Sequence, residues 1–151
     1  MTLYGSEPMQ IKPSLVGFAF AFGLVAGAAQ AQTVNFTAEL SGAQEVPAVA
    51  GAGKGMAMAS LNTATDTLSW EVSYSGLSGN ALAGHIHGPA ATGANAPVLV
   101  PFTAPLASPI KGSAKLTPAQ VKELEAGQMY VNIHTAEHKA GEIRGQLTPA
   151  K

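Results

Sequence analysis

The chain has 151 residues, enough for one domain, and few of them are charged: Asp, Glu, Lys and Arg make up 11% and the net charge is −1. This composition excludes a nucleic-acid-binding protein that depends on a clustered basic face, and no basic amphipathic helix indicates binding to a membrane surface. The chain has no cysteine, which excludes both a disulfide framework and a lipid anchor on a cysteine.

Residues 1–31 have the pattern of a secretory signal peptide. Lys12 gives a weakly positive start, residues 15–29 form an apolar run, and Ala29-Gln30-Ala31 fits the small-x-small cleavage pattern. The apolar run is short and rich in small residues, which favours cleavage after Ala31 over an uncleaved transmembrane anchor. We therefore expect a periplasmic or secreted domain at residues 32–151, with no membrane attachment after cleavage.

The position of the first methionine leaves two alternatives open. Residues 1–8 include Glu7 and add no positive charge, whereas a chain that begins at Met9 has a more ordinary signal-peptide start. Met9 is therefore an alternative to Met1 as the true start.

Residues 32–116 alternate short apolar runs with breaks rich in Gly, Pro, Asn and Ser, which is typical of an all-β domain. Trp70 and Tyr74 share a face of one run and are expected to anchor the core. Met56 and Met58 are also expected to fill the core, although their thioethers could instead bind copper(I). Asp66 is expected in a turn. The strands are predicted at residues 34–40, 55–61, 67–74, 81–87, 97–103 and 110–116.

One short helix is predicted at residues 118–126. Thr117 is a good N-cap, Pro118 suits the first helical position, and Gln120 completes a capping box. Gly127 suits the left-handed conformation that often ends a helix.

Two further strands are predicted at residues 129–134 and 141–147, where aliphatic and polar side chains alternate. Because successive side chains of a strand point to opposite faces, the aliphatic residues are expected to face the core and the polar residues the solvent. The solvent-facing set predicted for these strands and for residues 81–87 is His85, His87, Tyr130, Asn132, His134, Glu142, Arg144 and Gln146.

The four histidines are the strongest indication of chemistry. His85 and His87 share one face of a strand, about 6.5 to 7 Å apart at Cα, so their rings can converge on one ion. His134 is expected to supply a third ligand, and His138 either a fourth ligand or a solvated loop side chain. Imidazole ligands without a thiolate favour copper(II) over structural zinc. The sequence therefore predicts a mononuclear metal site, with copper as the cofactor.

Other polar residues are candidates for supporting roles around such a site. Arg144 could attract a small anion to an open metal position, and Glu142 could hold a histidine N–H or clamp Arg144. A simple cross-strand salt bridge between Glu142 and Arg144 is the more ordinary interpretation. Tyr130 and Asn132 are further candidates for contacts with the ligands.

Four motifs in this order resemble the CHRD domain, a family named after chordin that also occurs in secreted bacterial proteins. They are Phe36-Thr37-Ala38-Glu39-Leu40-Ser41-Gly42 with Gln44-Glu45-Val46-Pro47, then Gly84-His85-Ile86-His87-Gly88-Pro89-Ala90, Tyr130-Val131-Asn132-Ile133-His134-Thr135, and Gly141-Glu142-Ile143-Arg144-Gly145-Gln146-Leu147. The resemblance spans residues 34–147. It implies an immunoglobulin-like β-sandwich or barrel and brings no settled function.

A fainter resemblance, confined to a few residues, is to copper-zinc superoxide dismutase, a Greek-key β-barrel with a His-x-His pair on one strand. His85 and His87 match that pair, His134 or His138 a later copper ligand, and Arg144 the arginine that guides the anion. The chain lacks the disulfide cysteines and a zinc-loop ligand set, so the resemblance implies at most a copper-only site.

Three functions follow as alternatives. The first is a secreted domain that binds one metal ion, such as copper, in storage, buffering or delivery. The second is a superoxide dismutase-like enzyme on the same site, with superoxide as the small anion. The third is a non-catalytic module that binds an extracellular protein partner, which rests on analogy with chordin.

Overall fold

The computed structural model describes residues 32–151, so the predicted signal peptide and the two alternative starts lie outside the described part of the chain. It contains nine β-strands, one α-helix and one short 3-10 helix, η1 (Gly42–Gln44). The strands are β1 (Thr33–Ser41), β2 (Lys54–Asn62), β3 (Thr67–Ser75), β4 (Ala83–His87), β5 (Val98–Pro101), β6 (Ile110–Lys115), β7 (Tyr130–His134), β8 (Ile143–Gln146) and β9 (Thr148–Pro149). The all-β prediction is confirmed, and each predicted strand is present with ends that differ by at most two residues. The short β9 was not predicted.

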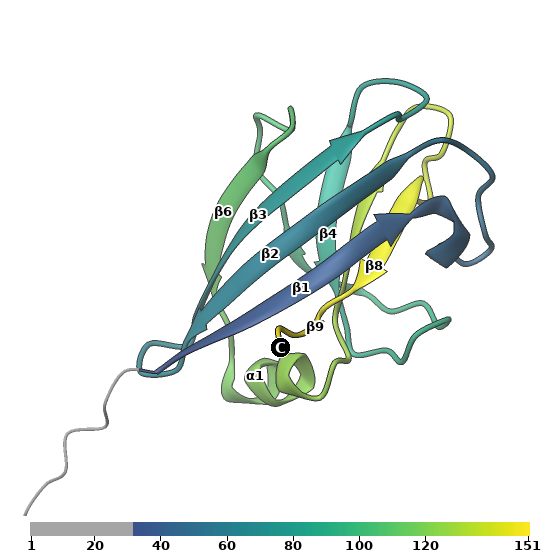
Figure 1. Cartoon of the computed structure of the whole chain (residues 1–151). Coiled ribbons are helices and arrows are strands. Elements are labelled where there is room, and N and C mark those ends of the chain that lie inside the picture. The colour runs from purple at the N-terminus through teal and green to yellow at the C-terminus, as the bar shows by residue number, and fades with distance from the viewer. Residues whose placement is uncertain (1–31) are drawn as a thin grey trace, which may run out of the picture.

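The strands form one antiparallel sheet that is nearly closed into a barrel. Its order is β5-β4-β7-β8-β1-β2-β3-β6, with the short β9 paired to β1. Figure 1 shows the sheet curving round, with β6, β3, β2 and β1 on the near side and β4 behind them. The two edge strands, β5 and β6, are consecutive in the chain, and residues 102–109 join them across the opening.

A ring stack and two hydrogen bonds, made by Trp70 and Tyr74 of β3, hold residues 102–109 across the gap between these edges. The rings of Trp70 on β3 and Phe102 after β5 stack with centroids 5.1 Å apart. The Tyr74 hydroxyl donates to the carbonyl of Leu106 at 2.6 Å, and the Tyr74 backbone N–H donates to Ser108 Oγ at 2.9 Å. Trp70 is 7% exposed and Tyr74 is partly buried, so the prediction that both anchor the core is confirmed.

The barrel interior is filled by the aliphatic residues of the alternating pattern. Each strand contributes every second side chain, and burial of each large apolar side chain stabilises the fold by about 1.5–3 kcal/mol. The fully buried large apolar side chains, from the strands and the segments next to them, are Phe36, Leu40, Leu61, Leu68, Ile86, Ile110, Leu124, Met129, Ile133, Ile143 and Leu147. Met56 and Met58 are 40% and 54% exposed, so the prediction that they fill the core is wrong. Their strand turns Ala57, Ala59 and Leu61 inward and therefore places both methionines outside.

The predicted helix is present as α1 (Pro118–Glu125) at one end of the barrel (Figure 1). Both hydrogen bonds of the predicted capping box form between Thr117 and Gln120. Leu124 is the buried residue of the helix. Gly127 follows with a positive φ of 69°, as its predicted role requires. Asp66 lies in the β2–β3 turn with a φ of 54°, in agreement with its prediction. None of the helices in residues 32–151 is long and apolar enough to cross a membrane.

Candidate metal centre

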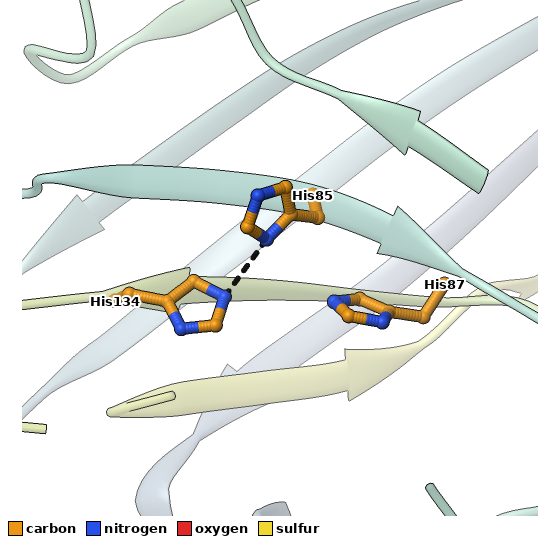
Figure 2. Close-up of side chains that lie close together, drawn as sticks. All are labelled: His85, His87 and His134. Carbon is orange, nitrogen blue, oxygen red and sulfur yellow. Dashed lines mark hydrogen bonds between the residues drawn. The ribbon is translucent and has the colours of Figure 1, made fainter. Parts of the chain in front are cut away.

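Antiparallel pairing of β4 with β7 brings the two histidine segments together. The register sets His85 opposite Asn132 and His87 opposite Tyr130, while Ala83 lies opposite His134. Residues opposite each other in a sheet point to the same face, so His134 is the diagonal neighbour of His85. Figure 2 shows the three imidazole rings of His85, His87 and His134 gathered on this face. Strand alternation and register alone therefore explain why residues 49 positions apart meet.

The ring nitrogens of these three histidines form a compact group. One nitrogen of each lies within 4.8 Å of the other two, and His85 Nδ1 is 2.9 Å from His134 Nε2. Two nitrogens bound to one ion at about 2.0–2.1 Å each are at most about 4.2 Å apart, so small side-chain rotations would bring all three into coordination. His138 is not part of the group; its backbone N–H donates to Thr135 Oγ1 at 3.2 Å.

Hydrogen bonds to backbone carbonyls determine which nitrogen of two rings is free. His87 Nδ1 lies 2.9 Å from the carbonyl of Ala96, and His134 Nδ1 lies 2.9 Å from that of Lys139. A carbonyl only accepts, so both Nδ1 atoms carry hydrogen and the Nε2 atoms are left for a ligand. His85 Nδ1 then donates to His134 Nε2, and a metal ion could take the place of this hydrogen.

The surroundings of His85 and His134 favour the uncharged form of these two rings. Burial, followed by the neighbouring His134 and His87, lowers the pKa of His85 below its ordinary value. Burial also lowers the pKa of His134, and His87 adds to this effect against an opposing hydrogen bond to Lys139. Neutral imidazoles have the free lone pair that a metal requires.

The face that carries these histidines is largely covered, with only His85, His134 and Gln146 partly exposed, so the prediction of a solvent-exposed polar face is wrong. Residues 88–97 fold over it, and their backbone supplies partners for the polar side chains, which explains the burial. Ala90 O accepts from Gln146, and Ala96 N–H donates to the Tyr130 hydroxyl at 3.1 Å. The exposed fractions are 9% for His87, 3% for Tyr130, 3% for Asn132, 3% for Glu142 and 2% for Arg144; His85, His134 and Gln146 are partly buried.

Tyr130 and Asn132, the two further candidates for contacts with the ligands, both contact His87. The ring of Tyr130 stacks on His87 with centroids 4.8 Å apart and planes 2° from parallel. Asn132 Oδ1 lies 3.0 Å from His87 Nε2. On the other side of Tyr130, the guanidinium carbon of Arg144 lies 3.4 Å from the ring centroid. His87 is therefore held by a stack that ends in a buried cation.

Glu142 and Arg144 do not form the predicted salt bridge. Arg144 donates to Asn95 Oδ1 at 3.0 Å and to the carbonyl of Ala94. Glu142 accepts from the backbone N–H and hydroxyl of Ser78, both at 2.7 Å, and from the Thr135 hydroxyl at 2.6 Å. These partners are loop groups that the strand pattern does not indicate. The hydrogen bonds of Glu142 include no histidine ring, and they fix instead the segment that follows His134.

Sequence reasoning missed one buried acid near the centre. Glu45 follows η1 in a loop rich in Gly, Ala and Pro, and it is 7% exposed. Its Oε1 has no hydrogen-bond partner. The available signal was an isolated carboxylate between Gln44 and Val46-Pro47 in an otherwise uncharged loop.

Comparison with known proteins agrees with the four motifs. A protein-family model described as the CHRD domain matches residues 36–147, which include the three histidines and Glu45. Searches of curated proteins and of solved structures found no match. Since the family model covers most of the chain, this protein belongs to the CHRD domain family.

Proposed function

We propose that this chain is an exported CHRD domain that binds a single metal ion through His85, His87 and His134. The observation that supports the proposal is the convergence of three imidazole nitrogens from two paired strands within 4.8 Å. Export is supported by the family, whose domains are typically extracellular, together with the signal-peptide pattern of residues 1–31.

Copper is the metal that this donor set favours. The three donors are borderline imidazole nitrogens, the chain has no cysteine, and no carboxylate belongs to the group. Hard ions such as calcium and magnesium prefer oxygen ligands, and structural zinc sites usually recruit thiolates. Copper(II) binds imidazole more tightly than the other divalent first-row metals.

Isothermal titration of the mature chain with a copper(II) salt tests this proposal. We expect one ion per chain and a loss of binding in the His85→Ala/His87→Ala variant. His138→Ala removes a histidine outside the group and should leave the affinity nearly unchanged. Micromolar or weaker binding that is the same in wild type and double variant would reject the metal site.

A superoxide dismutase-like activity is a second candidate, supported by the partial exposure of His85 and His134. Three protein ligands leave a coordination position for a small molecule. Arg144 gives this candidate little support, because its guanidinium is buried and bonded to Ala94 and Asn95. A superoxide-consumption assay on copper-loaded chain decides; a rate no greater than that of free copper rejects catalysis.

A further inference from the structure

Glu45 is a buried carboxyl group with no part in the proposed ligand set. Its backbone is fixed, because its N–H donates to the carbonyl of Gly42 at 3.1 Å and the next carbonyl, that of Val46, accepts from Asn95. Its side chain is nevertheless left with Oε1 buried and without a hydrogen-bond partner. A buried polar atom in this condition costs about 1–3 kcal/mol, and this cost points to a role for the residue beyond packing.

The neighbour of this carboxyl is the side-chain amide of Asn132. Gly141, with a φ of 132°, brings its backbone against both groups: a Cβ at this position would overlap Glu45 Oε1 and lie 2.6 Å from Asn132 Nδ2. Asn132 Nδ2 has a single long hydrogen bond, 3.5 Å to the carbonyl of Ala140, and so retains the capacity to donate. The other end of the same amide, Oδ1, faces His87 Nε2 at 3.0 Å.

The surroundings of Glu45 act on its ionisation in opposite directions. Burial raises the pKa of Glu45 to about 7, against the opposing effects of Arg144, the Asn132 amide and the Val46 backbone. Arg144 is the charged group that acts on the carboxyl, from β8. The carboxyl therefore changes its protonation state near neutral pH.

We propose that Glu45 is a positioning residue of the metal centre, which through the amide of Asn132 determines whether Nε2 of His87 is free to bind a metal ion. This inference rests on the proposed function. The Asn132 amide can face His87 either with Oδ1, which only accepts a hydrogen bond, or with Nδ2, which only donates one.

An ionised Glu45 only accepts hydrogen bonds, so it holds Asn132 Nδ2 on its own side and leaves Oδ1 facing His87. Oδ1 cannot donate to the Nε2 lone pair, and together the two atoms form an electronegative position that favours a cation. A protonated Glu45 can instead donate to Oδ1. The amide then turns, Nδ2 donates to Nε2, and the lone pair that a metal needs is occupied.

Copper(II) titration between pH 6 and pH 8 tests the inference with a matched pair of variants. Glu45→Gln is expected to bind copper about 10-fold more weakly than wild type at pH 8. At pH 6 the two chains should bind copper with similar affinity, because wild-type Glu45 is then protonated and carries no charge, like the glutamine. Glu125→Gln makes the same chemical change on the exposed face of α1 and should match wild type at both pH values.

The outcomes separate this inference from the proposed function. Wild-type chain that fails to bind copper rejects both. Wild-type chain that binds copper, with equal affinity in Glu45→Gln at pH 8, rejects the role of Glu45 alone.

A second measurement needs neither metal nor a stable variant. In the metal-free wild-type chain, the NMR signals of the Asn132 side-chain amide should shift with a midpoint near pH 7, where Glu45 ionises. The same step should be missing from Glu45→Gln if that variant folds. Amide signals in wild type that stay unchanged from pH 6 to pH 8 overturn the inference.

Discussion

Glu45 and Glu142 are both buried carboxyl groups, yet their environments shift them in opposite directions. Burial opposes ionisation of Glu142, but hydrogen bonds from Thr135 and Ser78 outweigh it and lower the pKa of the group. At Glu45, burial outweighs the opposing effects of Arg144, the Asn132 amide and the Val46 backbone, and the pKa is raised to about 7. The two residues should therefore make opposite contributions to the pH dependence of stability.

Glu142 should stabilise the fold at neutral pH and lose this effect in acid. A lowered native pKa means that its contribution is complete above the ordinary value of 4.5 and is lost as the pH falls through the native pKa. Glu142→Gln should lower the free energy of unfolding by about 1.5–3 kcal/mol at pH 7, because hydrogen bonds to a charged group are lost. Urea denaturation at pH 7 and pH 3 checks this; a deficit that is just as large at pH 3 contradicts it.

Glu45 should act in the reverse sense. A raised native pKa of an acid means that the contribution of Glu45 to stability is complete below 4.5 and is lost as the pH rises from 4.5 to about 7. The decline should be about 1–3 kcal/mol in wild type and should be missing from Glu45→Gln. Urea denaturation between pH 4 and pH 8 measures this decline. If the free energy of unfolding depends on pH in the same way in wild type and Glu45→Gln, ionisation of Glu45 does not destabilise the fold and the prediction is wrong.

Strand positions were predictable from the sequence because alternation is a local property. Facing was predictable where apolar and polar residues alternate, but not in β2, where Met56 and Met58 alternate with the equally apolar Ala57 and Ala59. Ile133 and Ile143 had to face inward once the pattern was recognised, and both are fully buried. The meeting of His85 with His134 needed the register of β4 with β7, which alternation only permits. The cover of residues 88–97 was not predictable, because backbone carbonyls such as that of Ala96 leave no trace in the pattern of side chains.

Because Arg144 contacts residues 88–97, which cover the sheet, it should stabilise the fold more than an exposed charged residue does. Its guanidinium packs on Tyr130 and bonds to Ala94 and Asn95, which ties residues 88–97 to the sheet. Arg144→Ala should lower the free energy of unfolding by about 2–4 kcal/mol, since two bonds from a charged donor and a cation–π contact are lost. Lys111→Ala breaks the exposed pair with Glu71 and should cost at most about 1 kcal/mol. Equal losses in chemical denaturation would contradict the role assigned to the cover.

At the scale of the whole molecule, a metal ion held between β4 and β7 links binding to global stability, because the unfolded chain does not keep the histidines together. Copper at 100 times its dissociation constant should raise the free energy of unfolding by about 2.7 kcal/mol. Because burial lowers the pKa of His85 and His134, protons compete with copper for these two rings only at a lower pH than they would for an ordinary histidine. The copper-induced rise in Tm should therefore be largest at pH 8, decline as Glu45 is protonated near pH 7, and shrink further by pH 5 as protons take the histidine nitrogens. A rise in Tm that is independent of pH from 5 to 8, or that persists in His85→Ala/His87→Ala, would place the ion elsewhere.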